Sequence, residues 1–208
     1  MTARVLSVDA PRAAAEAAEV LRAGGLVALP TDTDYGVAAA LDESAIERIF
    51  AAKQRPTERA VPVLLSDAGA APLVTREFPE AARKLAASFW PGPLTIAVPR
   101  REDLPPNLTQ LPTVAVRVPD HAGARAVIAA AGGALAVTSA NRSDEPPACT
   151  VEAAIAALGE RVALYLDGGP CSGGVPSTVI TLEAGEPRVL RSGPIHESAL
   201  RAALGLDG

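Results

Sequence analysis

Short apolar runs of strand length recur along this chain and limit the folds open to it. They include "LVALP" at 26–30, "LTIAVP" at 94–99 and "TVAVRVP" at 113–119. Runs this short, bounded by Pro, Gly and polar residues, are typical of buried strands. Helix-like stretches separate some of these runs but not all, so strands and helices do not alternate strictly. The pattern predicts one α/β domain with an open, twisted, mixed sheet flanked by helices.

The helix-like stretches have recognisable starts. Asp9 and Asp42 are predicted N-caps, because a short acidic side chain can accept the first backbone N–H groups of a helix. The helix after Asp42 is expected to bury one face, formed or bordered by Ile46, Ile49, Phe50 and Lys53. Other helices are expected over about 10–23, 79–89, 121–131, 151–158 and 197–204. "PSTVITLE" and "PRVLR" are expected to form a hairpin-type pair.

Length and composition fit a single domain over 1–208, with a motif-bearing core at about 20–195 and a short C-terminal helix. The net charge is −5, so the protein has no overall positive charge that would attract nucleic acid non-specifically. Two cysteines and two histidines cannot build a usual metal cage, so no metal ligands are predicted. Without a leader or a long apolar run, we expect a cytoplasmic protein with no membrane partner.

Polar clusters lie where the predicted strands end. They are "PTDTDYG", "KQRP", "TVAVR", "TSANRS", "GGVPSTV" and "RSG". Binding groups commonly sit on loops held by a rigid sheet, so these clusters predict one extended pocket. "PTDTDYG", directly after the strand at 26–30, is either an ordinary turn or one wall of that pocket.

The charged members of these clusters admit two interpretations. Lys53 and Arg55 either complement a helix C-terminus or clamp a phosphate chain. Arg117 shares a predicted strand face with Thr113, and it is either a solvated or ion-paired residue or a receptor for carboxylate or phosphate. Spacing alone leaves these alternatives open.

Hydroxyl and amide groups complete the set. "TSAN" and "GGVPSTV" offer either turn and capping groups or ligand contacts, and His121 and His196 are expected to be surface or capping residues. No P-loop and no persuasive nucleophile–base pair is present. This inventory suits anionic substrates that react through positioning and charge neutralisation. Residue chemistry alone favours a nucleotide-handling enzyme over a passive anion-binding module.

In their order along the chain, these stretches resemble the YrdC-like family of threonylcarbamoyl-adenylate synthases, in its single-domain form. The matching segments are "LPTDTDYGVAA", "KQRP" with "VPVLLSD", "WPGPLTIAV", "TVAVRVPDH", "TSANRS", "LDGG" with "PSTVI", and "VLRSGPI". The resemblance implies a large, positively lined cavity. It implies that L-threonine, bicarbonate or CO2, and ATP give threonylcarbamoyl-AMP and pyrophosphate, with Mg²⁺ helping to carry the charge of the leaving group. The product is implied to pass to a tRNA threonylcarbamoyl transferase complex.

The resemblance also assigns roles to residues. Those implied to bind L-threonine are Thr31, Arg117, Ser139 and Ser177. Those implied to bind ATP are Lys53, Arg55, Thr113, Asn141 and Arg191. Lys53 and Arg55 are also the implied catalytic residues.

Three positions depart from the family pattern, and their roles stay open: Arg59, Asp144 and Cys149. Two other functions also stay open. One is an RNA-binding module, with tRNA contact as a special case, although the acidic balance and the lack of aromatic platforms argue against it. The other is a paralogue that uses a different small acid or carbamoyl donor.

Overall fold

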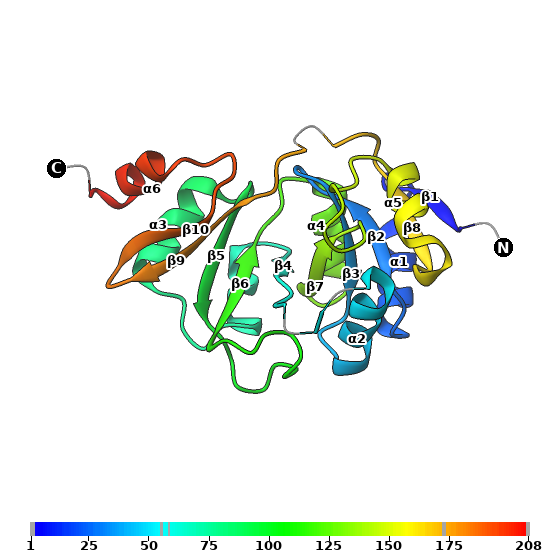
Figure 1. Cartoon of the computed structure of the whole chain (residues 1–208), viewed down its shortest axis with the longest axis horizontal. Helices are drawn as coiled ribbons and strands as arrows, with labels where there is room; N and C mark the ends of the chain where they lie inside the picture. Colours follow the sequence, from blue (N-terminus) through cyan, green and yellow to red (C-terminus); the bar gives the residue numbers. More distant parts are fainter. Residues whose placement is uncertain (1–2, 55, 58, 172–173, 207–208) are drawn as a thin grey trace.

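Ten strands form one mixed sheet in the described part of the computed structural model, which comprises residues 3–54, 56–57, 59–171 and 174–206. Their order across the sheet is β1-β8-β2-β3-β7-β4-β6-β5-β9-β10. The strands are β1 (Val5–Ser7), β2 (Val27–Pro30), β3 (Tyr35–Ala39), β4 (Val63–Leu65), β5 (Leu94–Pro99), β6 (Thr113–Arg117), β7 (Ala134–Ser139), β8 (Leu164–Asp167), β9 (Thr178–Glu183) and β10 (Glu186–Arg191). Figure 1 shows β1 and the β9–β10 hairpin at opposite ends of the molecule. The predicted mixed α/β sheet is confirmed.

Strand pairing brings distant polar clusters together. β3 lies antiparallel between β2 and β7, and its register places Gly36 opposite Ser139. The "PTDTDYG" turn therefore adjoins "TSAN". Farther along the sheet, β5 runs parallel to β9, and Leu94 pairs with Thr178. This second pairing sets Thr95 beside the start of the "PSTV" strand.

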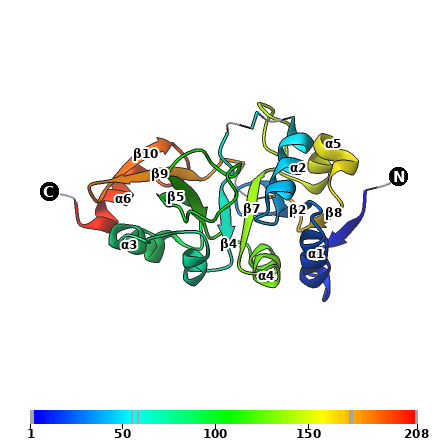
Figure 2. The ribbon, with the colours of Figure 1, turned by 90° about the horizontal axis from the view of Figure 1, so that it is seen from below.

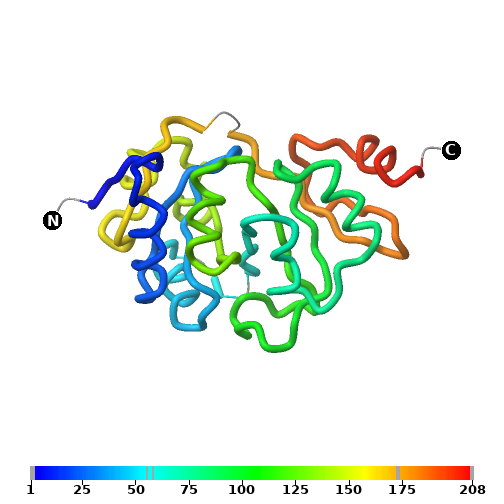
Figure 3. The backbone as a smooth tube through the Cα atoms, turned by 180° about the vertical axis from the view of Figure 1, so that it is seen from behind, coloured from blue at the N-terminus to red at the C-terminus, as the bar shows by residue number. Residues whose placement is uncertain are grey.

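Helices cover both faces of the sheet near β2. The helices are α1 (Ala13–Arg22), α2 (Glu43–Lys53), α3 (Glu80–Phe89), α4 (Ala122–Ala130), α5 (Val151–Leu158) and α6 (Glu197–Leu204). Figure 2 shows α1 and α4 on one face, with α2 and α5 on the other. Two buried apolar clusters correspond to these two layers. Seen from behind in Figure 3, the segment before α1 and the segment containing α6 lie at opposite ends of the long axis.

Helix α2 begins where its sequence predicts, and it includes Lys53 as its last residue. The Asp42 carboxylate accepts the backbone N–H groups of Ser44 and Ala45 at 3.0 and 3.2 Å, which confirms the predicted cap. The helix ends at Lys53, and Gln54 follows with a left-handed φ of 51°. The buried face includes Ile46, Ile49, Phe50 and Lys53, as expected. Because α2 is fixed at its start and along one face, the position of Lys53 is set by the fold.

Other local predictions differ from the structure. Asp9 is not the cap of α1, because the chain makes successive turns through Pro11 and the helix begins only at Ala13. Strands β1 and β3 have no counterpart among the predicted strands. The prediction for His121 is confirmed, since its Nδ1 accepts the backbone N–H of Ala124 at 3.2 Å and caps α4. Within the described ranges, no helix is long and apolar enough to cross a bilayer.

Candidate functional site

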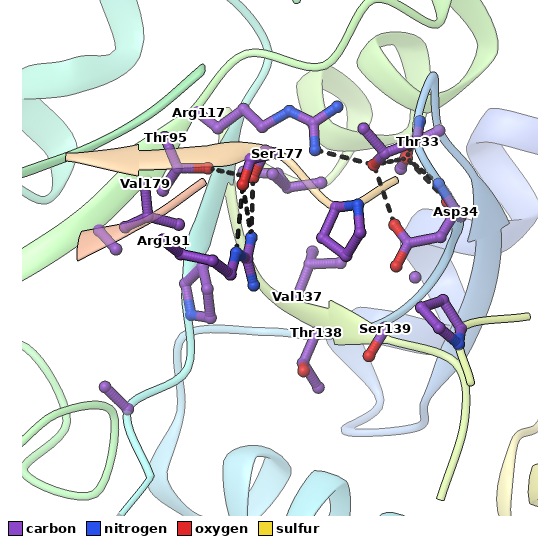
Figure 4. Close-up of a pocket in the computed structure, with 18 residues that line it drawn as sticks. Thr33, Asp34, Thr95, Arg117, Val137, Thr138, Ser139, Ser177, Val179 and Arg191 are labelled. Carbon is purple, nitrogen blue, oxygen red and sulfur yellow. Dashed lines mark hydrogen bonds between the residues drawn. The ribbon is translucent and has the colours of Figure 1, made fainter. Parts of the chain in front are cut away.

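A cavity of about 270 Å³ lies over the central strands of the sheet. Its walls come from the turn between β2 and β3 and from β5, β6, β7, β9 and β10. The polar residues among its walls are Thr31, Thr33, Asp34, Thr95, Arg117, Thr138, Ser139, Ser177 and Arg191. Figure 4 shows Arg191 and Ser177 on one side and Asp34 with Thr33 on the other. A polar cavity of this size suits a small molecule.

The β2–β3 turn is closed by the side chain of Thr31. Its hydroxyl donates to the Asp34 carbonyl at 2.7 Å and accepts the Thr33 backbone N–H at 3.2 Å. The hydroxyls of Thr31 and Thr33 are 3.1 Å apart, and both residues are buried. These bonds fix Thr33 and Asp34 in the cavity wall. "PTDTDYG" therefore is a turn and also forms one wall of a pocket.

Arg117 is a buried arginine held by its own set of acceptors. Its Nε donates to the Gly92 carbonyl at 3.0 Å, and Nη1 donates to the Thr33 hydroxyl at 3.0 Å. Nη2 forms an ion pair with Asp32 at 2.5 Å, with side-chain exposures of 7% and 15%. Asp32 also accepts the Asp120 backbone N–H at 2.9 Å. Arg117 is thus ion-paired, as one interpretation of the sequence expected, and it also lies in the cavity wall, while its role as a receptor for carboxylate or phosphate stays a prediction.

Arg191 and Ser177 form the opposite wall. The Arg191 guanidinium donates to the Ser177 carbonyl at 2.9 and 3.2 Å and to the Ser177 hydroxyl at 3.1 Å. That hydroxyl also lies 2.8 Å from the hydroxyl of Thr95. Partial burial lowers the pKa of Arg191, but arginine keeps its charge at neutral pH. The result is a fixed positive group at the rim of the cavity.

Glycine at position 193 is required for this wall. A Cβ at Gly193 would lie 2.4 Å from the Thr178 backbone nitrogen and 2.5 Å from the Pro176 carbonyl oxygen. Only glycine lets these two backbones approach so closely. The "RSG" segment can therefore run beside "PSTV", and Arg191 reaches Ser177.

Lys53 is held by protein acceptors and does not line the described cavity, although the family resemblance implies that it contacts ATP. Its side chain is buried, and the ammonium donates to the carbonyls of Ser139 and Asn141 and to Asn141 Oδ1 at 3.2 Å. It is absent from the described walls of the cavity. The geometry shows Lys53 holding the segment after β7, so direct contact with a phosphate stays a prediction. Its implied partner Arg55 lies outside the described residues.

Two further implied nucleotide contacts also lie away from the cavity walls. Thr113 begins β6 and pairs with Pro99, whereas Ala115 and Arg117, on the same strand face, do line the cavity. Asn141 lines a neighbouring cavity of about 530 Å³, and Pro147 belongs to both cavities. The structure thus unites Thr31, Arg117, Ser139, Ser177 and Arg191 and sets Thr113 and Asn141 apart.

Asp34 is the main cavity residue that the sequence did not single out. Its carboxylate accepts the Thr33 hydroxyl at 2.9 Å. Burial raises its pKa, although the Thr33 hydrogen bond and the charges of Arg117, Arg191 and Lys53 act in the opposite direction. Its position inside the polar cluster "PTDTDYG" could have indicated a binding role. An aspartate in such a cluster usually only stabilises the turn, so the sequence did not single it out.

The three positions that depart from the family pattern have structural explanations. Arg59 and Asp144 form an exposed ion pair at 3.0 Å, which contributes little to stability. Asp144 has a φ of 66°, a conformation that favours glycine. Cys149 is half-buried, and its carbonyl accepts the backbone N–H of Cys171 at 2.9 Å. In the described ranges, no three His, Cys, Asp or Glu side chains gather as a metal site.

Comparison with known proteins identifies the family. Residues 19–193 match the model of the Sua5/YciO/YrdC family, which is described as telomere recombination. The chain belongs to this family, and the resemblance found in its sequence is confirmed.

Three relatives illustrate the match. A threonylcarbamoyl-AMP synthase from Bacillus subtilis is 39% identical over 203 residues, covering 96% of this chain and 58% of that protein. A protein from Mycobacterium tuberculosis is 37% identical over 198 residues, covering 94% of this chain and 91% of that protein. The crystal structure of Pyrococcus abyssi Sua5 complexed with L-threonine has a TM-score of 0.90 and 35% identity, covering 98% of this chain and 60% of that one. The chain thus spans only part of two of these relatives.

Proposed function

We propose that this chain is an L-threonylcarbamoyladenylate synthase, a nucleotidyltransferase that makes threonylcarbamoyl-AMP and pyrophosphate from L-threonine, bicarbonate or CO2, and ATP. The observation that carries the proposal is the buried Arg117 guanidinium in the wall of an amino-acid-sized polar cavity. The P. abyssi relative, crystallised with L-threonine, supports the choice of amino acid.

Arg117 is suited to receive the carboxylate of threonine. Its contacts with Thr33 and Asp32 use one N–H of each terminal nitrogen, and each nitrogen carries a second N–H. A guanidinium can bind a carboxylate through two parallel hydrogen bonds. Hydroxyls of Thr31, Ser139 and Ser177 belong to the same walls and would contact the rest of the amino acid.

Arg191 is suited to the phosphates of ATP, since it presents a fixed positive charge opposite the β2–β3 turn. We place the remainder of the nucleotide toward the neighbouring cavity, where Asn141 lies. Mg²⁺ would arrive bound to the ATP phosphates, because the described residues form no cage for it. Roles for Lys53, Arg55 and Thr113 in nucleotide binding remain predictions.

The reaction joins three components without a protein nucleophile. The threonine ammonium loses a proton, and the free amine adds to CO2 and loses a second proton to give a carbamate. A carbamate oxygen then attacks the α-phosphorus of ATP, forming the mixed anhydride as pyrophosphate leaves. The contribution of this chain is to hold the two substrates in line and to offset negative charge. The unstable product would pass to a tRNA-modifying transferase complex in the cytoplasm.

The test is pyrophosphate release from ATP and Mg²⁺ with bicarbonate, in the presence and absence of L-threonine. We expect release to require L-threonine, and mass spectrometry to detect threonylcarbamoyl-AMP. Replacing L-threonine by D-threonine controls for stereospecific binding. Pyrophosphate release at the same rate without threonine would exclude the synthase. Pyrophosphate release with no formation of threonylcarbamoyl-AMP would exclude it as well. Salt-sensitive RNA binding without turnover would favour the RNA-binding alternative.

A further inference from the structure

Asp34 carries a partly buried carboxylate for which the described residues supply no direct positive partner. Its side chain lines the cavity, and its carboxylate accepts one hydrogen bond, from the Thr33 hydroxyl at 2.9 Å. Each ion pair among the described residues joins other groups, and Arg117 pairs with Asp32 instead. Burial raises the pKa of Asp34 despite the surrounding positive side chains. A carboxylate that is shielded from much of the solvent and has no paired cation is costly, which suggests that a bound ligand supplies the cation.

The position of Asp34 relative to Arg117 specifies the kind of ligand. The Thr33 hydroxyl donates to Asp34 and accepts from Arg117 at 3.0 Å, so a single hydroxyl separates the two charged groups. A negative and a positive receptor this close together match the two charged groups that an α-amino acid carries on its Cα. A simple hydroxy acid offers only the negative charge, and Asp34 would repel it.

We propose that Asp34 binds the α-ammonium group of the amino-acid substrate and selects zwitterionic amino acids over the corresponding hydroxy acids. This inference rests on the proposed function and adds a specificity-determining residue to it. Arg117 receives the carboxylate, and Asp34 fixes the end of the molecule at which the carbamate forms. The nitrogen is thereby held on the side of the cavity that faces Arg191.

The experiment compares two ligands by isothermal titration calorimetry. L-threonine carries both charges, and (R)-3-hydroxybutyrate is the same molecule without the amino group. The variant Asp34→Asn keeps the shape of the side chain and removes its charge. Asp67→Asn changes an exposed carboxylate outside the cavity walls and serves as the matched control.

We expect Asp34→Asn to weaken L-threonine binding by about ten- to a hundredfold, the range for a charge-assisted contact. Binding of (R)-3-hydroxybutyrate should be unchanged or tighter, because the repulsion is gone. A variant that merely distorted the cavity would weaken both ligands together, and that result would overturn the inference. Equal threonine affinity in Asp34→Asn and wild type would overturn it as well.

The two proposals can fail separately. If the wild type binds L-threonine and makes threonylcarbamoyl-AMP while Asp34→Asn binds threonine equally well, only the role of Asp34 is wrong. If the wild type neither binds L-threonine nor forms product, the proposed function is wrong and the role of Asp34 falls with it.

Discussion

The ammonium of Lys53 donates to Asn141 twice, to its backbone carbonyl and to its side-chain oxygen. A third bond reaches the Ser139 carbonyl. The last residue of α2 thus fixes the backbone that follows β7. Loss of this group would disturb the cavity wall at Ser139 indirectly.

We therefore predict that Lys53→Met lowers the free energy of unfolding by about 2–3 kcal/mol, because buried carbonyls lose their donor. Urea denaturation would measure the change. Lys84→Met, on the exposed side of α3, should stay within about 0.5 kcal/mol of wild type. Wild-type stability in Lys53→Met together with lost turnover would instead support the phosphate contact implied by the family resemblance.

The Asp32–Arg117 pair should show strong energetic coupling. A double-mutant cycle with Asp32→Asn and Arg117→Met is expected to give about 2 kcal/mol, because both side chains are largely buried. The exposed Glu183–Arg188 pair, at 2.7 Å with exposures of 59% and 66%, is the matched control and should give at most about 0.5 kcal/mol. Equal coupling in the two cycles would show that burial does not strengthen the pair.

Arg117→Ala should also weaken L-threonine binding more than ATP binding. Calorimetry with each ligand would measure the two affinities, after circular dichroism has shown that the variant is folded. The expected loss for threonine is at least tenfold, since a guanidinium–carboxylate contact contributes about 1.5–3 kcal/mol. A larger loss for ATP would move Arg117 from the amino-acid end of the site to the phosphate end.

Asp34 should make stability depend on pH. Its folded-state pKa is raised above the ordinary 3.8 by burial, so its ionisation opposes folding at neutral pH. In the absence of ligand, Asp34→Asn should have the higher Tm at pH 8. This advantage should shrink as the pH falls through the raised pKa toward 3.8, where wild-type Asp34 becomes neutral. A difference in Tm that is constant with pH would contradict this account.

The thiol of Cys171 should react slowly with alkylating reagents. Burial raises its pKa to about 11, so little thiolate is present at pH 8. In Cys149→Ser, where Cys171 is the remaining cysteine, iodoacetamide labelling followed by mass spectrometry should be slow at pH 8 and faster as the pH rises. Urea-unfolded protein provides the reference rate. Equal rates in the folded and unfolded states would show that the thiol is not protected.

Patterns local in sequence were the ones that could be predicted. The Asp42 cap, the buried face of α2 and the β9–β10 hairpin depend on neighbouring residues, and all three appear in the structure. Strand β1 is only three residues long, and β3 follows the turn residues of "PTDTDYG" and is rich in small side chains, so neither gave a clear strand pattern. Strand β1 pairs with β8, and β3 pairs with β7 as well as with its sequence neighbour β2, so distant strands contribute to both.

The site residues divide in the same way. Helical spacing places Lys53 on the buried face of α2, but its acceptors, at positions 139 and 141, come from another part of the chain. Strand alternation correctly places Ala115 and Arg117 on one face, whereas the Asp32 partner of Arg117 depends on how β2 and β6 are arranged in space. Asp34 became distinctive only when its burial and its lack of a direct ion pair could be seen.

The cavity joins residues made early and late during synthesis of the chain, from Thr31 to Arg191. On a ribosome, the earlier strands emerge while β9 and β10 are still missing, so the pocket cannot yet close around a substrate. During that interval β5 has β6 as its sheet neighbour and lacks β9, which leaves a temporary open edge. Such an edge can pair with another nascent chain and promote aggregation. Docking of the final hairpin therefore completes the pocket and protects the exposed strand in a single event.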